Sequence, residues 1–257
     1  MTDIAVEKSN NAVLNQPVAD EELEALLKAG IHLGHAKSKN HPSMQPFIFG
    51  VRNNISILDL TKTKEKLHKA LDFIKSVAAK NGLILLVGTR PAAKKIVVEV
   101  AEKNKMPYLT ERWIGGALTN FKVIAKRVEY MEYTEKEKAE GGFEKYTKKE
   151  RLDKDEEILK LQKMFHGLRP LKRLPEAVFV VNIIENETPV REAKILKIPV
   201  VALVDTNSNV SLIDWPIPSN DDALPAVRYM VERVGEAIEE GYKEQKTQST
   251  ETQGAGL

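Results

Sequence analysis

The sequence contains no cysteine among its 257 residues. This absence excludes disulfide bonds, thiolate metal sites and cysteine nucleophiles together, and it agrees with a reducing cytoplasm. No apolar run approaches the roughly 18 residues that a membrane-spanning helix needs. Residues 1–17 carry Asp3 and Glu7 and have no apolar core, so they match neither a secretory signal nor a transit peptide. We interpret residues 1–17 as a flexible tail and expect a cytoplasmic location.

A strong excess of charge of one sign is also missing. Lys and Arg number 39, Asp and Glu number 37, and the formal net charge is +2. Any surface for nucleic acid must therefore come from local clusters of Lys and Arg rather than from the field of the whole chain. With 42% hydrophobic and 30% charged residues, the composition is that of a globular protein with one main domain.

Short apolar runs alternate with helical stretches along most of the chain. The runs are 83–87, 177–181 and 200–204, and the helical stretches are 62–80, 92–103, 188–196 and 222–240. Runs that are apolar throughout are typical of parallel strands covered on both faces. A shorter pair, 47–49 and 55–58, predicts an edge hairpin. The sequence therefore predicts an α/β fold built from βαβ units around a mostly parallel sheet.

An inserted segment interrupts this alternation. Its apolar residues recur at spacings of three and four, first as Phe121, Ile124, Val128 and Met131, and again after Gly141 and Gly142. Because the remaining positions are rich in Lys and Glu, we predict an antiparallel α-helical hairpin over residues 122–170 that projects from the body and packs mainly on itself. The α/β body then comprises residues 18–121 and 171–242, and residues 243–257 are expected to be a disordered tail.

Motifs for catalysis and for nucleotide binding are absent as well. The turn at residues 87–91 closes a strand and opens a helix, but with only Gly88 it matches neither the dinucleotide fingerprint nor the P-loop. Asp205 ends a buried strand where α/β enzymes place acids, yet no base, nucleophile elbow or glycine-rich loop accompanies it. We predict no enzyme activity and no cofactor, and we interpret Asp205 as a turn carboxylate.

The two histidines of Gly30–His35 allow three interpretations. His32 and His35 could ligate a metal, but no cysteine or carboxylate follows at ligand spacing. They could instead fix a loop through hydrogen bonds, which we prefer, or contact RNA together with nearby lysines. We predict no metal site.

Basic and aromatic residues near turns are the candidates for RNA contact. The turn after Gly88 could hold an RNA phosphate. Trp113 could stack on a base, although a buried tryptophan at a domain junction is equally consistent with the sequence. The segment 169–173 is basic without acids of its own and should return to the body beside Arg112. The candidate RNA-binding residues are His32, His35, Lys37, Lys39, Arg52, Arg90, Lys94, Lys95, Arg112, Trp113, Arg169, Lys172 and Arg173.

Several motifs in one order identify a family. They are residues 32–35, 46–50, 52–53, 59–60, 62–63, 87–89, 111–116, 118–120, 198–202, 204–207, 216–218 and 220–223. Over residues 20–241 the chain resembles the family of the second protein of the small ribosomal subunit, in its bacterial form.

This resemblance implies a doubly wound α/β body of Rossmann-like or flavodoxin-like type with an inserted α-helical coiled-coil hairpin. It also implies that the protein is bound to ribosomal RNA and neighbouring proteins where the head of the subunit meets its body. It also implies late joining in assembly and support for docking of the large mRNA-binding first protein, with no membrane and no small-molecule substrate. The sequence departs from the family pattern at residues 40–43, 91–92 and 182–185. The resemblance does not carry RNA contacts over to these three places, while the fold is unaffected.

Two rival functions differ in class from an RNA-binding scaffold. A small-molecule α/β enzyme would use the strand ends near Gly88 and Asp205, and it would need a coupled acid and base that the sequence lacks. A protein adaptor would bind partners through the hairpin, and its binding would survive ribonuclease.

Overall fold

The main sheet has parallel strands throughout. The structure, a computed structural model, describes residues 20–254 and the side chains of residues 20–245. The strands are β4 (Ile84–Val87), β5 (Tyr108–Leu109), β6 (Ala177–Val181), β7 (Val200–Val204) and β8 (Trp215–Pro218), in the order β5-β4-β6-β7-β8. After β4 the chain adds β5 on one side and then returns to the other side for β6, so the winding direction reverses there. This confirms the predicted doubly wound α/β fold.

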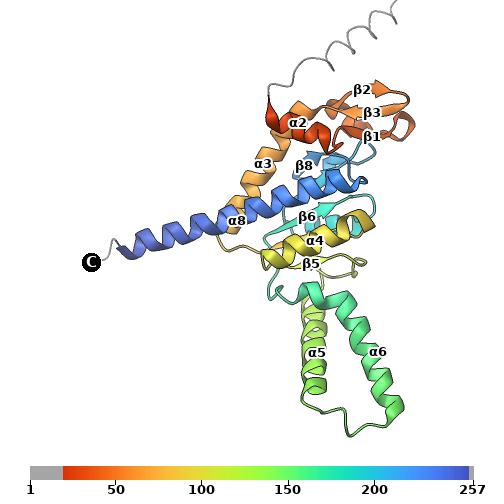
Figure 1. Cartoon of the computed structure of the whole chain (residues 1–257), viewed down its shortest axis with the longest axis vertical. Helices are drawn as coiled ribbons and strands as arrows, with labels where there is room; N and C mark the ends of the chain where they lie inside the picture. Colours follow the sequence, from red (N-terminus) through yellow and green to blue (C-terminus); the bar gives the residue numbers. More distant parts are fainter. Residues whose placement is uncertain (1–19, 255–257) are drawn as a thin grey trace, which may run out of the picture.

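Two apolar layers cover the sheet because every residue of β4, β6 and β7 is buried. Side chains alternate between the faces of a strand: in β4, Ile84 and Leu86 join one core, and Leu85 and Val87 join the other. The first core is completed by α2 (Glu21–Lys28), α3 (Leu60–Ala79), α4 (Pro91–Lys103) and α8 (Leu224–Gly254). Figure 1 shows α8 crossing this face beside α3 and α4. The second core receives α7 (Glu187–Ile195) and the 3₁₀ helices η2 (Pro42–Phe47) and η4 (Val210–Leu212).

A separate antiparallel sheet precedes the main one along the chain. It has the order β1-β3-β2, with β1 (Leu33–Ala36), β2 (Ile48–Arg52) and β3 (Ile55–Leu58). The turn between β2 and β3 has positive φ angles at Asn53 and Asn54, which is the backbone of a tight hairpin turn that asparagine tolerates. The predicted hairpin is confirmed, but its position at the edge of the main sheet was wrong, because it belongs to this separate sheet. Strand β1 was not expected, since its sequence suggested only a loop.

The inserted segment contains α5 (Phe121–Ala139) and α6 (Lys148–Phe165), which project from the body side by side (Figure 1). Thr147 and Glu150 form a reciprocal capping box at the start of α6, which stabilises its first turn. The base of the segment does not pack only on itself. Its apolar side chains join the second core of the body: Ile124, Val128, Met131, Phe165 and Leu168.

We therefore predict that the length of a deletion decides its effect. Replacing residues 123–168 by a short Gly/Ser linker should unfold the body, because five large buried side chains, at about 1.5–3 kcal/mol each, approach the whole stability of a domain. Replacing only residues 136–157 should leave the body's melting transition intact, because it keeps those side chains. Circular dichroism melts of the two variants measure this, and equal melting temperatures would mean that the base is not part of the core.

The last helix is longer than the sequence suggests. We predicted a disordered tail from residue 243, but α8 continues to Gly254. The Lys75 ammonium lies 3.3 Å from a Glu240 oxygen and 2.8 Å from a Glu244 oxygen, and Tyr242 packs against the first core. Of these contacts, that between Glu244 and Lys75 of α3 lies past the predicted boundary, and the helix continues beyond it. The predicted tail at residues 1–17 lies outside the described residues, and none of the described helices could cross a membrane.

Candidate nucleic-acid interface

The carboxyl ends of β4, β6, β7 and β8 lie along one edge of the main sheet, because parallel strands end on the same side. The small sheet covers this edge. A Cβ atom added to Gly34 of β1 would overlap the Thr206 side chain, so glycine alone permits this close approach. Asp205 and Asp221 at the edge are both buried. The strand ends therefore form a closed polar junction between the two sheets.

His35 of β1 joins the small sheet to the loops that follow β7 and β8. Its Nδ1 lies 3.1 Å from an Asp205 oxygen, its Nε2 lies 3.3 Å from an Asp222 oxygen, and its backbone N–H donates to Thr206 Oγ1 at 2.9 Å. The hydrogen bond to Asp205 raises the pKa of His35, although burial opposes the shift. Both ring nitrogens are thus occupied, which favours the loop-fixing interpretation over RNA contact.

His32 differs from His35 in having no partner. Its Nδ1 is buried and makes no hydrogen bond, and burial lowers the pKa of the ring. A neutral, half-buried imidazole gives little attraction for phosphate. Among the described residues, no group of three or more His, Asp or Glu side chains has an arrangement that could hold a metal ion.

Asp221, which the sequence did not single out, is the least satisfied group of the junction. It is fully buried, and neither carboxylate oxygen accepts a hydrogen bond. Burial first, and then repulsion by Asp205, raises the pKa of Asp221 to about 7, against the opposing attraction of Arg90. Burial therefore favours the uncharged form of this carboxyl.

Arg90 and Lys94 are held by carboxylates of the protein itself. Arg90 Nε donates to Glu185 Oε1 at 2.9 Å, and Arg90 is also paired with Asp222. Lys94 Nζ lies 3.1 Å from Glu111 Oε1. The turn after Gly88 was expected to offer these cations to an RNA phosphate, but carboxylates already occupy them. Pro91 does begin α4, as its position predicts.

Trp113 belongs to a loop organised by one buried glutamate, Glu192 of α7. Glu192 Oε1 accepts from Trp113 Nε1 at 2.8 Å and from Gly116 N at 2.8 Å. Its Oε2 accepts from Leu118 N at 3.0 Å, from Thr119 N at 3.1 Å and from Thr119 Oγ1 at 3.1 Å. Burial alone would raise the pKa of Glu192, but these hydrogen bonds outweigh it and lower the pKa. The indole thus has a structural partner, and Glu192 was missed because its partners lie more than 70 residues away.

The basic return segment, residues 169–173, has no acids of its own, but acids from other parts of the chain neutralise it. Arg169 Nη2 donates to Glu135 Oε1 at 2.6 Å, and Lys172 Nζ lies 3.5 Å from Glu132 Oε1. Arg173 pairs with Glu176 and donates to the Asn81 carbonyl at 3.0 Å. Glu132 and Glu135 come from α5, so these pairs fasten the hairpin to the body.

The remaining predicted cations are exposed and have no carboxylate within 4.0 Å among the described residues: Lys37, Lys39, Arg52, Lys95 and Arg112. Three of them lie at one end of the small sheet. Ala36 and Arg52 are both paired with Ile55, from opposite sides of β3, and Lys37 N donates to the Asn54 carbonyl at 2.9 Å. Two strand spacings, roughly 10 Å, therefore separate the backbones that carry Lys37 and Arg52.

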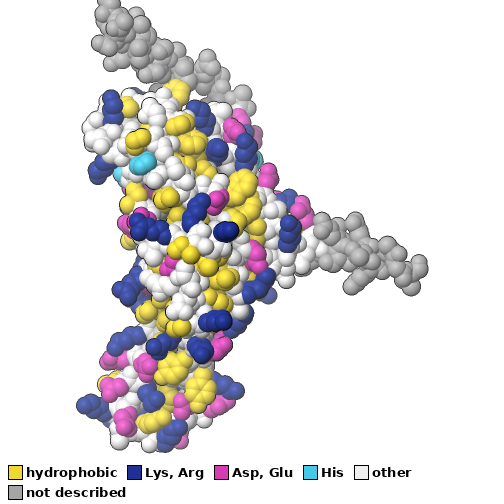
Figure 2. Space-filling model, turned by 180° about the vertical axis from the view of Figure 1, so that it is seen from behind, with side chains coloured by type: hydrophobic (Ala, Val, Ile, Leu, Met, Phe, Trp, Pro, Cys, Tyr) yellow, Lys and Arg dark blue, Asp and Glu magenta, His cyan; other side chains and the backbone are white. Residues whose placement is uncertain are grey.

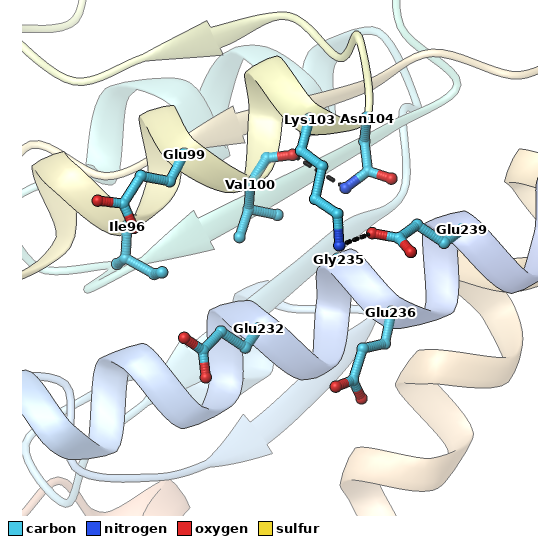
Figure 3. Close-up of a pocket in the computed structure, with 9 residues that line it drawn as sticks. All are labelled: Ile96, Glu99, Val100, Lys103, Asn104, Glu232, Gly235, Glu236 and Glu239. Carbon is cyan, nitrogen blue, oxygen red and sulfur yellow. Dashed lines mark hydrogen bonds and ion pairs between the residues drawn. The ribbon is translucent and has the colours of Figure 1, made fainter.

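A groove between α4 and α8 has the wrong charge for nucleic acid. It has a volume of about 330 Å³ and is lined by Glu99, Glu232, Glu236 and Glu239, with Lys103 reaching across to Glu239 (Figure 3). Carboxylates repel phosphate, so this face is not a candidate for the interface.

Comparisons with known proteins agree on one family. A family model described as "Ribosomal protein S2" matches residues 26–241. The small ribosomal subunit protein uS2 of Porphyromonas gingivalis is 45% identical over 225 residues, which cover 88% of this chain and 80% of the relative. The proteins of that name from Dehalococcoides mccartyi and Roseiflexus sp. are 40% and 41% identical, over 90% and 91% of this chain and 95% and 89% of the relatives.

Proposed function

The chain belongs to the ribosomal protein S2 family, and from this premise we propose that it binds ribosomal RNA through exposed, unpaired cations of its α/β body. Family membership makes it a structural, non-enzymatic constituent of the small ribosomal subunit, active in translation on the cytoplasmic ribosome. The predicted absence of enzyme activity agrees with this family.

The observation that carries the proposal is the group of free cations at one end of the small sheet, Lys37, Lys39 and Arg52. Affinity for RNA depends on how many cations can replace the counterions of its phosphates. A lysine or arginine already paired with a carboxylate contributes less, since the carboxylate repels the incoming phosphate. Lys95 and Arg112 meet the same condition and are secondary candidates.

Finer parts of the proposal are supported by the resemblance of the motifs. We propose that the protein contacts RNA and neighbouring proteins where the head of the subunit meets its body, and that it joins late in assembly. We also propose that it supports docking of the large mRNA-binding first protein.

Loss of the free cations should weaken binding in a salt-dependent way. The change Lys37→Gln with Lys39→Gln and Arg52→Gln should lower affinity for small subunits that lack this protein. It should also flatten the slope of log affinity against log salt by about two to three units, at about 0.7–0.9 per phosphate contact. Sedimentation of the mixtures through sucrose gradients at several salt concentrations measures both quantities.

The matched control removes three exposed cations that are paired with carboxylates one helical turn away: Lys28→Gln, Lys69→Gln and Arg191→Gln. Its slope should stay close to that of the unchanged chain. If the unchanged chain does not sediment with the subunit, the proposed function is wrong. If the unchanged chain does sediment with it and the two triple variants have the same affinity and salt slope, the RNA surface lies elsewhere.

A further inference from the structure

One face of α5 carries cations followed by tyrosines. Lys122, Lys126, Tyr130 and Tyr133 follow one another at spacings of four, four and three residues, which places them along a single side of the helix. Arg127 lies beside them, and all five residues are exposed. We call these five residues the α5 face.

The acids of α5 lie on both sides of the helix, because Glu129 and Glu137 share the side of the α5 face whereas Glu132 and Glu135 do not. Glu132 and Glu135 point to the return segment, where they pair with Lys172 and Arg169. The three cations of the α5 face have no carboxylate within 4.0 Å among the described residues, including Glu129 of the same helix. The three cations of the α5 face therefore make no ion pair with a described residue, whereas the cations of the return segment are paired with carboxylates.

The tyrosines leave aromatic surface in water. Tyr133 is 64% exposed and Tyr130 is 39% exposed. Tyr130 Oη donates to Glu157 Oε1 of α6 at 3.2 Å, which fixes the position of its ring at the hydroxyl end. Figure 2 shows hydrophobic side chains on the surface of the projecting hairpin, with Lys and Arg between them and the body. Exposed rings next to free cations are the combination that binds unpaired nucleotides, because bases stack on the rings while cations contact the phosphates.

We propose that the α5 face binds an unpaired stretch of the ribosomal RNA, with Tyr130 and Tyr133 stacking on bases and with Lys122, Lys126 and Arg127 on phosphates. The proposal rests on the proposed function and adds a second RNA site with a defined nucleotide class. The three cations of the α5 face favour RNA over an apolar protein partner, because an apolar partner would bury them without a counter-charge.

The test measures binding of full-length variants to small subunits that lack this protein. Lys122→Gln with Lys126→Gln and Arg127→Gln should flatten the salt slope by about two to three units. The control Lys136→Gln with Lys145→Gln and Lys160→Gln removes the same charge from the same hairpin. Each of its lysines is paired with a glutamate, so its slope should change by less than about one unit.

The tyrosines are tested separately from the charge. Tyr130→Leu with Tyr133→Leu should weaken binding by about 5- to 150-fold for each stacked base without changing the salt slope. Tyr130→Phe with Tyr133→Phe keeps the rings and should bind like the unchanged chain. Circular dichroism establishes that each variant keeps its helices.

Photo-crosslinking identifies the partner. A benzoylphenylalanine in place of Tyr133, irradiated in the assembled subunit, should give a product that ribonuclease shortens. A product that only protease removes would assign the face to a protein and overturn the proposal, as would cation and tyrosine variants that bind like the unchanged chain. Failure of the unchanged chain to bind the subunit would instead contradict the proposed function.

Discussion

Glu192→Ala should lower the free energy of unfolding by about 3–5 kcal/mol. The buried carboxylate accepts five hydrogen bonds from the loop that contains Trp113. A buried donor left without an acceptor costs about 1–3 kcal/mol, and water can reach only the more exposed of these groups. Urea denaturation followed by tryptophan fluorescence measures the loss, because Trp113 itself reports on the loop.

The dependence on pH identifies the carboxylate as the cause. Because the hydrogen bonds lower the pKa of Glu192 in the folded state, its stabilisation is present above the unfolded pKa and is lost as the pH falls through the folded value. The difference between Glu192→Ala and the unchanged chain should thus shrink in acid. Glu187→Ala on the same helix removes only an exposed pair with Arg191 and should cost at most about 0.5 kcal/mol. If both variants are equally stable, the loop does not depend on Glu192.

Asp221→Asn should raise stability at pH 8 by about 2–4 kcal/mol. The folded pKa of about 7 lies above the ordinary value of 3.8, and each unit of difference corresponds to about 1.4 kcal/mol. A raised folded pKa gives stability that is present below the unfolded pKa and is lost as the pH rises through the folded pKa. The unchanged chain should therefore lose stability between about pH 4 and 7, whereas the uncharged amide should not. Urea denaturation at pH 5 and pH 8 should show the larger gain at pH 8.

The neighbouring carboxylate provides a control of opposite sign. Asp222 is paired with His35 and with Arg90, so Asp222→Asn should lower stability at pH 7. If Asp221→Asn also loses stability at pH 8, the attraction of Arg90 outweighs burial, and Asp221 is ionised in the folded protein.

Local patterns determined most of the fold. The apolar runs of β4, β6 and β7 are buried on both faces in the structure, as continuous apolar composition predicts. Asn53 and Asn54 formed the expected hairpin turn, and the ordered motifs led to the correct family. These features depend on residues that are close in sequence, because a strand face, a turn and a helix stripe each repeat within a few positions.

Only the tertiary structure decided which charges remain free. Arg90 is paired with Glu185, 95 residues away, and the return segment is paired with Glu132 and Glu135 of α5, so the strongest sequence candidates for RNA contact are largely neutralised. We did not predict RNA contact for the α5 face, although its residues are close in sequence. The sequence of a helix with mixed charges does not show which of its acids pair with other elements and which cations stay unpaired. Burial of Asp221 and the loop around Glu192 likewise depend on elements that meet only after folding. Electrostatic interactions act across distance in space, and the sequence records only distance along the chain.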